Sequence, residues 1–173
     1  MPIDGDAEFS ALVQRQSRFV FKVAYAVLLN SYDAEDAVQE TFLKLYRNQG
    51  WKRAENERAF LARIAWRIAV DFKRRQSRAG SPDSVGSNEP PSPRPDPEVA
   101  LSRANQESVI HALIDSLAEN LRVPLVLSAF EELNSREIAE IVGVPEGTVR
   151  TRLQRARQIL RQKLGSLRET RYA

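Results

Sequence analysis

The sequence predicts an all-α protein with two small helical domains joined by a flexible linker rich in proline and serine. Three observations favour this class. Apolar residues recur at helical spacing in both halves, no segment alternates as a strand would, and six of the nine prolines lie between Pro82 and Pro97. A segment of that composition buries too little apolar surface to form a core. We therefore predict domains at residues 1–75 and 99–173, a disordered linker at 76–98, and a helix-turn-helix in the second domain.

Three helices are expected in the N-terminal domain. The first runs from about Phe9 to Leu28, the second opens at Tyr32-Asp33, and the third spans 59–75, with 51–57 as a loop or short turn. The second helix carries an inward stripe of Ala34, Ala37, Val38, Phe42 and Leu45. The inward residues of the third are Leu61, Ile64, Ala65, Ile68 and Phe72.

Four helices are expected after the linker. The first two span 99–117 and 121–133, and Pro124 fits only the first turn of its helix because proline lacks a backbone donor. The other two form a motif, SREIAEIVGVPEGTVRTRLQ, at 135–154. Asn134 or Ser135 caps its first helix, Gly143 ends it, and Pro145 starts the second.

The second helix of this motif is basic. Its inward residues are Val149, Leu153, Ala156 and Leu160, which leaves a row of arginines and short polar side chains for the other faces. Arginine binds phosphates or the edge of guanine, so the pattern is typical of a helix that enters the DNA major groove. The alternative is a solvated basic helix in an ordinary bundle.

Charge is distributed unevenly, although the net charge is only +3. Residues 51–80 hold nine Lys/Arg against three acids and residues 145–173 hold eight against two, whereas residues 31–40 hold four acids and no base. Two basic surfaces indicate nucleic acid and the acidic one indicates a basic partner.

The chain has no cysteine, which excludes disulfides and thiolate metal sites and is compatible with a cytoplasmic location. We expect no signal peptide and no membrane insertion.

The acidic segment DAEDAVQETFLKLY, at 33–46, has three interpretations. Asp33, Asp36 and Glu40 share one helical face beside Gln39. Acids in a first helical turn stabilise the helix dipole without any further role. A carboxylate metal site is the second interpretation, weakened by the absence of a histidine at ligand spacing. A docking surface for a basic partner is the third.

The segment FLARIAWRIAVDFKRR, at 60–75, interleaves aromatic and basic residues. Single-stranded DNA binding needs a charged track for the backbone and flat faces for the bases. The alternative is that Phe60 and Trp66 belong to the core of a small helical domain.

With these three segments in this order across a linker, the chain resembles a bacterial RNA polymerase sigma factor of the extracytoplasmic-function (ECF) group. The resemblance implies that 33–46 binds core RNA polymerase, 60–75 recognises and opens the −10 promoter element, and 135–154 binds the −35 element. Two departures are visible. Asp71 stands where many members carry Asn, and Ala118 replaces a common proline.

The resemblance also implies roles for individual residues. The polymerase-binding residues are Asp33, Asp36, Gln39, Glu40 and Phe42, with Phe42 supporting the helix from inside. The −10 residues are Arg63, Trp66, Arg67, Lys73 and Arg74, and the loop at 51–57 forms a pocket for an extruded base. The −35 residues are Thr148, Arg150, Thr151, Arg152, Gln154 and Arg155.

The implied partners are core RNA polymerase, promoter DNA and an anti-sigma factor, with no small-molecule substrate. No catalytic residue, cofactor or metal is expected. A helix-turn-helix repressor or activator that acts alone is the alternative function. A recombinase is disfavoured, because Tyr25, Tyr32 and Tyr46 lie on a helical domain too small for one.

Overall fold

The computed structural model describes residues 3–80, 100–131 and 133–172, and all secondary structure in these ranges is helical. The helices are α1 (Ile3–Leu28), α2 (Ser31–Asn48), a 3-10 turn η1 (Gly50–Arg53), α3 (Glu57–Arg78), α4 (Ala100–Asp115), α5 (Glu119–Glu131), α6 (Ser135–Val142) and α7 (Glu146–Tyr172). The predicted all-α class is confirmed. Most of the linker predicted at 76–98 lies outside the described residues.

The first three helices form a bundle around the apolar stripe of α1. Leu12, Val20 and Val23 of α1 are at most 1% exposed and share a core with Leu45 of α2 and Leu61 of α3. Asparagine caps two of these helices, since the side chain of Asn30 accepts from the backbone of Asp33 and that of Asn56 from Ala59. The caps fix where α2 and α3 begin, and hence which of their faces point outward.

The helix-turn-helix forms as the sequence predicts. Asn134 and Glu137 make a reciprocal capping box at the start of α6, and Gly143 ends it with φ 72° and ψ 36°. Ile138 of α6 and Val149, Leu153 and Ala156 of α7 are buried. Because these residues hold α7 by one face, its polar faces are left to solvent.

Residues 50–53 form the 3-10 turn η1, which agrees with the loop or short turn expected at 51–57. Two details of the prediction are corrected. Helix α3 continues through Arg78, so the linker cannot start at Gln76. Pro124 lies five residues beyond the first residue of α5, not in its first turn. Its missing N–H leaves the Asn120 carbonyl without the usual helical donor, a cost offset by the burial of the proline ring.

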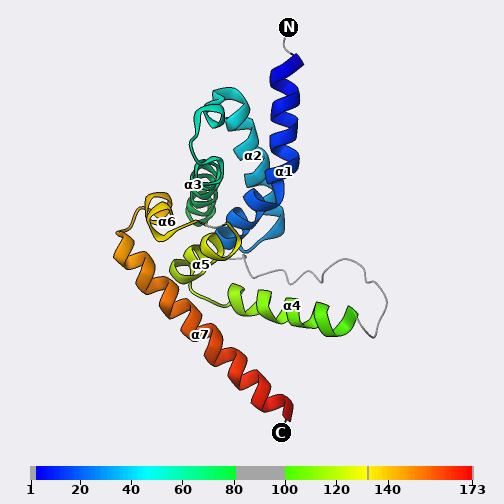
Figure 1. Ribbon diagram of the computed structural model, residues 1–173, viewed down its shortest axis with the longest axis vertical. Helices are drawn as coiled ribbons and strands as arrows, with labels where there is room; N and C mark the ends of the chain where they lie inside the picture. The colour runs from blue at the N-terminus through cyan, green and yellow to red at the C-terminus, as the bar shows by residue number, and fades with distance from the viewer. Residues whose placement is uncertain (1–2, 81–99, 132, 173) are drawn as a thin grey trace.

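The two halves of the chain pack against each other, which the sequence did not indicate. In Figure 1, α5 lies across α1 and α6 lies beside α3, while α4 and the long α7 extend away from the bundle. The buried residues of both halves form one continuous apolar cluster.

Gly143→Ala should lower the free energy of unfolding by about 1–2 kcal/mol, because a side chain is strained in the left-handed region that this residue occupies. Urea denaturation measures the change. Gly147→Ala is the matched control. It lies within α7 with open space around its Cβ position, so it should be neutral or stabilise by up to about 1 kcal/mol. Equal effects at the two positions would contradict the conformational explanation.

Candidate nucleic-acid and protein interfaces

The acidic face of α2, formed by Asp33, Asp36, Gln39 and Glu40, lies on the surface. Asp36 and Gln39 are exposed. Asp33 accepts a hydrogen bond of 2.7 Å from Gln76 Nε2, and Glu40 lies 3.7 Å from Arg75 Nη2. These contacts with the end of α3 hold two of the acids in place and leave Asp36 outermost.

Two apolar residues on the same face were missed by the sequence interpretation. Leu43 and Tyr46 are 56% and 48% exposed, and their spacing from Asp36 and Gln39 places them on the acidic face. Phe42, by contrast, is buried at 7% and packs edge-on against Phe9 of α1. Large apolar side chains exposed among charges are typical of a protein-binding surface. Their position outside the inward stripe could have identified them.

The start of α3 is fixed to α1 by a forked ion pair. Arg15 donates to both carboxylate oxygens of Glu57, at 3.2 and 2.7 Å, and Gln16 Nε2 donates to Oε1 at 2.8 Å. The hydrogen bond from Arg15 is the main cause that lowers the pKa of Glu57 below its usual 4.5, and burial opposes it. This contact sets the direction in which α3 leaves the bundle.

The predicted −10 residues lie along α3 but differ in their surroundings. Arg67 and Arg74 are exposed, and Trp66 is half-buried against the core. Arg63 Nη2 lies 3.5 Å from Glu140 Oε2, and Lys73 pairs with Glu119. Both carboxylates belong to the C-terminal half of the chain, so two of the five residues already have an anionic partner.

Trp51 is a core residue. It is 8% exposed and its ring packs 6.3 Å from that of Phe9, with Lys52 Nζ 5.5 Å from the ring centroid. An indole in that position offers no open face to a base. Within the loop 51–57, where the resemblance implies a pocket for an extruded base, the indole of Trp51 is therefore part of the core.

A basic groove runs between α7 and the start of α6. It has a volume of about 410 Å³, and its polar and charged lining residues are Ser128, Asn134, Ser135, Arg150, Gln154, Arg157 and Arg161. Arg150, Gln154, Arg157 and Arg161 recur at helical spacing, so one face of α7 carries three positive charges. Arg157 and Arg161 were not among the predicted −35 residues, although the same spacing could have revealed them.

The other predicted −35 residues lie outside the lining of this groove. Thr151 and Arg155 are exposed, and Thr148 and Arg152 are half-buried. Arg150 is tethered to Glu146, one helical turn earlier, at 2.6 Å. Of the six predicted residues, Arg150 and Gln154 line this groove.

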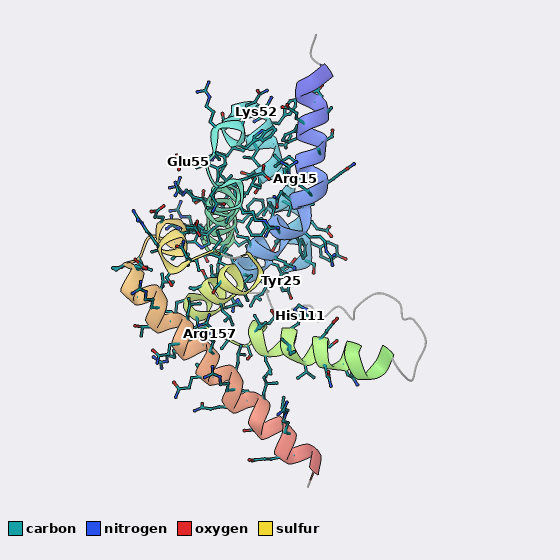
Figure 2. All side chains as sticks on the ribbon, in the orientation of Figure 1. Arg15, Tyr25, Lys52, Glu55, His111 and Arg157 are labelled. Carbon is teal, nitrogen blue, oxygen red and sulfur yellow. The ribbon has the colours of Figure 1, made fainter. Side chains whose placement is uncertain are left out.

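A larger, mostly apolar groove of about 800 Å³ lies between α1, α2, α4 and α5. Phe21 and Tyr25 stack along it at 5.9 Å, and Arg18 and Lys22 add positive charge. Figure 2 labels Tyr25 and His111, which approach the groove from α1 and α4. Tyr25 also donates to Asp115 at 3.2 Å, and burial is the main cause that raises the pKa of its hydroxyl.

Within ranges 3–80, 100–131 and 133–172, no group of three or more His, Cys, Asp or Glu side chains is arranged to hold a metal ion. No helix in the same ranges is both long and apolar enough to cross a membrane.

Comparison with known proteins assigns the acidic helix α2, the basic helix α3 and the helix-turn-helix to one protein family. Residues 12–79 match Sigma-70 region 2, and residues 108–160 match Sigma-70 region 4. The chain belongs to the ECF sigma factors. It is 30% identical to the ECF RNA polymerase sigma factor SigW of Bacillus subtilis, with 95% of this chain and 92% of the relative covered. As a sigma factor it directs core RNA polymerase to promoters.

Other relatives agree with this membership. The sigma factor SigE of Mycolicibacterium smegmatis is 33% identical over 88% of the chain, which spans 60% of that longer relative. The RNA polymerase sigma-H factor of Pseudomonas aeruginosa is 30% identical, with 92% of this chain and 87% of the relative covered.

Two solved structures share the fold. The sigma factor RpoE bound to the anti-sigma factor NepR, from Bartonella quintana, superposes with a TM-score of 0.68 at 21% identity, covering 91% of this chain and 97% of that one. CnrH in complex with the cytosolic domain of CnrY gives 0.62 at 21% identity, with 93% and 90% covered.

Glu57→Gln should destabilise the protein at neutral pH, and the difference from wild type should shrink as pH falls. The pKa of Glu57 is lower in the folded state, so its contribution is complete above pH 4.5 and is lost as it protonates below that value. Urea denaturation at pH values from 7 to 3 measures this. Glu55→Gln, an exposed acid nearby, is the control. A pH-independent difference would contradict a role for the ionised carboxylate.

Proposed function

We propose that this sigma factor works through three surfaces, one for the polymerase and two for the promoter. The acidic face of α2 docks on core RNA polymerase, α3 serves the −10 element and the basic groove of α7 serves the −35 element. The observation that carries the proposal is the placement of one acidic and two basic surfaces on separate helices of one chain, in the order of Sigma-70 regions 2 and 4.

Docking on the polymerase combines charge with apolar contact. Asp36 and Gln39 meet basic and polar groups of the partner, while Leu43 and Tyr46 bury apolar surface beside them. Charge complementarity steers association, and the buried apolar and aromatic side chains supply much of the affinity. Phe42 acts from the core by holding α2 on α1 rather than by touching the partner.

The −10 element meets α3. Arg63, Arg67, Lys73 and Arg74 lie along its length and neutralise phosphates, which orients the DNA strand without reading its sequence. Trp66, half-buried among them, presents an aromatic edge against which a base unstacked from the duplex packs. Contacts made only with unpaired DNA favour opening of the duplex.

The −35 element meets α7. Arg150 and Gln154, near the N-terminus of the helix, are placed to reach base edges, together with Thr148, Thr151, Arg152 and Arg155 on the adjoining faces. Arg157 and Arg161 lie further along the same groove and serve as phosphate contacts. Before DNA binds, Arg150 is paired with Glu146, one helical turn earlier.

The linker limits how far apart the two promoter-binding halves can lie. We propose that the first domain runs from residue 1 to 78, because α3 ends at Arg78, and that the second domain remains 99–173. A flexible segment of about 21 residues averages roughly 25 Å and stretches to about 70 Å. Two groove sites one and a half DNA turns apart are about 50 Å apart. Binding of the first half therefore concentrates the second near its own site.

The chain supplies no catalytic group in this scheme, since phosphodiester synthesis belongs to the polymerase. It acts in the cytoplasm, where the polymerase is.

An anti-sigma factor is a further partner. Of the two solved structures that share this fold, one is the sigma factor RpoE with the anti-sigma factor NepR, and the other is CnrH with the cytosolic domain of CnrY. The apolar groove beside Phe21 and Tyr25 is the surface that we propose for an amphipathic segment of that partner.

Addition of the purified protein to core RNA polymerase should produce promoter-specific run-off transcripts from a promoter library. Asp36→Arg should weaken core binding and transcription at least about tenfold, because it places a like charge against the basic partner. Glu169→Arg makes the same charge change at an exposed acid near the far end of α7, away from α2, and is the control. Failure of wild type to add any specific transcript would overturn the proposal, and tight operator binding without polymerase would instead favour a repressor.

Arg150→Ala should cost about 1–3 kcal/mol in promoter binding by the holoenzyme and relax the preference at one −35 position. Transcription from promoters with each base substituted in turn measures the preference. Arg168→Ala removes an exposed arginine at the far end of α7 and should change neither quantity. A uniform loss over all −35 sequences would show that Arg150 contacts a phosphate rather than a base.

A further inference from the structure

We infer that Arg15 and Gln16 of α1 are positioning residues for −10 recognition, because they fix the loop that leads into α3. This inference rests on the proposed assignment of the −10 element to α3 and on the base contact implied for residues 51–57. Both residues act through Glu57, the first residue of α3, and not by touching DNA themselves.

The carboxylate of Glu57 is held by three hydrogen bonds from α1. Arg15 donates from Nε at 3.2 Å and from Nη2 at 2.7 Å, one bond to each oxygen, and Gln16 Nε2 donates at 2.8 Å. A planar guanidinium that meets a carboxylate through two bonds fixes its orientation as well as its position. The first turn of α3 therefore has a defined direction relative to α1.

Gln16 is a polar side chain in an apolar surrounding, since it is only 6% exposed in the middle of α1. Its Nε2 donates to Glu57, while its Oε1 is buried without a hydrogen-bond partner in the described structure. A buried acceptor without a partner is unfavourable, and an apolar residue of similar size would avoid that cost. Packing alone therefore does not account for a glutamine here, and the contact with Glu57 does.

The same helix also holds the beginning of the loop. Trp51 packs against Phe9 with ring centroids 6.3 Å apart, and Lys52 Nζ lies 3.0 Å from Glu8 Oε2. The α1 residues of these contacts precede those that bind Glu57 by seven positions. Seven positions are about two helical turns, or about 10 Å, along one face of a helix. Both ends of the loop are therefore fixed to one rigid element.

The backbone that enters the loop is constrained as well. Gln49 has a positive φ of 46°. A Cβ added at Gly50 would lie 3.1 Å from Cζ of Phe60 in α3. This close approach leaves little room for any side chain, which favours glycine at the position. The loop is thus held from α3 in addition to α1.

Between its fixed ends the loop presents a short polar tip. Arg53 and Glu55 are exposed, and Figure 2 shows Glu55 further from α1 than Lys52. A loop that already has its binding conformation avoids the entropy cost of ordering when the ligand arrives. Selection of a single unstacked base is also sensitive to small displacements of the groups that contact it. Loss of the contacts at Glu57 should therefore weaken base selection more than binding in general.

Arg15→Lys tests this inference, because lysine keeps the positive charge but cannot bind both oxygens of Glu57 in a planar fork. Run-off transcription by the holoenzyme, with each −10 base substituted in turn, measures base preference. The variant should lose at least about fivefold of the preference at the position that the loop contacts. Core binding and the preference at −35 positions should stay unchanged.

Arg168→Lys is the matched control, since it is the same substitution at an exposed arginine near the end of α7, and it should alter none of these quantities. A uniform loss of transcription by Arg15→Lys, with every −10 preference retained, would overturn the inference. It would show that Arg15 stabilises the fold or binds a phosphate without positioning the loop.

Gln16→Leu separates positioning from stability. This variant removes the bond to Glu57 and the unpaired Oε1 together, so its stability in urea should equal or exceed that of wild type. Its −10 preference should nevertheless fall by about twofold or more. Full retention of that preference would contradict a positioning role for Gln16.

Hydrogen exchange in the free protein reports on the loop without a promoter. The amides of Lys52, Ala54, Ala59 and Phe60 are hydrogen-bonded in the loop and the first turn of α3. In Arg15→Lys they should exchange at least about fivefold faster than in wild type, while amides of α7 exchange at equal rates. Equal exchange in the loop would overturn the inference. Absence of any promoter-specific transcript from the wild-type holoenzyme would count against the proposed function instead, and the exchange rates would still report on the loop.

Discussion

Burial of the apolar stripe of α1 is the constraint on which the rest of the structure depends. Helix α1 packs against α2 and α3 of its own half and against α5 of the other half. Leu12, Val20 and Val23 leave almost no surface to solvent. Because α2 and α3 are held by their inward faces, the acidic face of one and the basic side of the other are turned outward. The polymerase-facing and −10-facing surfaces are thus consequences of one packing arrangement.

Charged side chains have two different roles in this molecule. The Arg15–Glu57 pair and the Asn134–Glu137 capping box fix helices in place, so these charged and polar groups act within the fold. Arg157 and Arg161 line an open groove and keep their charge for an external anion, whereas Arg150 beside them is paired with Glu146 at 2.6 Å. Arg63 and Lys73 belong to both categories, because acids of the C-terminal half now hold cations that we assign to DNA.

Spacing in the sequence was sufficient to predict the helices and the outward direction of most site residues. The asparagine caps, Gly143 and the periodicity of α7 are local features, and local backbone chemistry decides them. Leu43 and Tyr46 were missed because they were treated as part of an amphipathic helix, although they lie off its buried stripe. The resemblance implied a base pocket at the loop 51–57, and the burial of Trp51 within that loop depends on packing against Phe9, which is far away in the sequence.

The sequence by itself determined the all-α class, the helix-turn-helix, the three charged segments and their resemblance to ECF sigma factors, since each depends on residues close together in the chain. Only the tertiary structure decided which charged side chains are paired with a distant part of the chain. The contacts of Glu119 and Glu140 with α3, of Glu137 with the cap residue Asn56, and of Arg122 with α1 join residues far apart in sequence. Such pairings depend on how two packed halves meet, and no local pattern of side chains encodes that geometry.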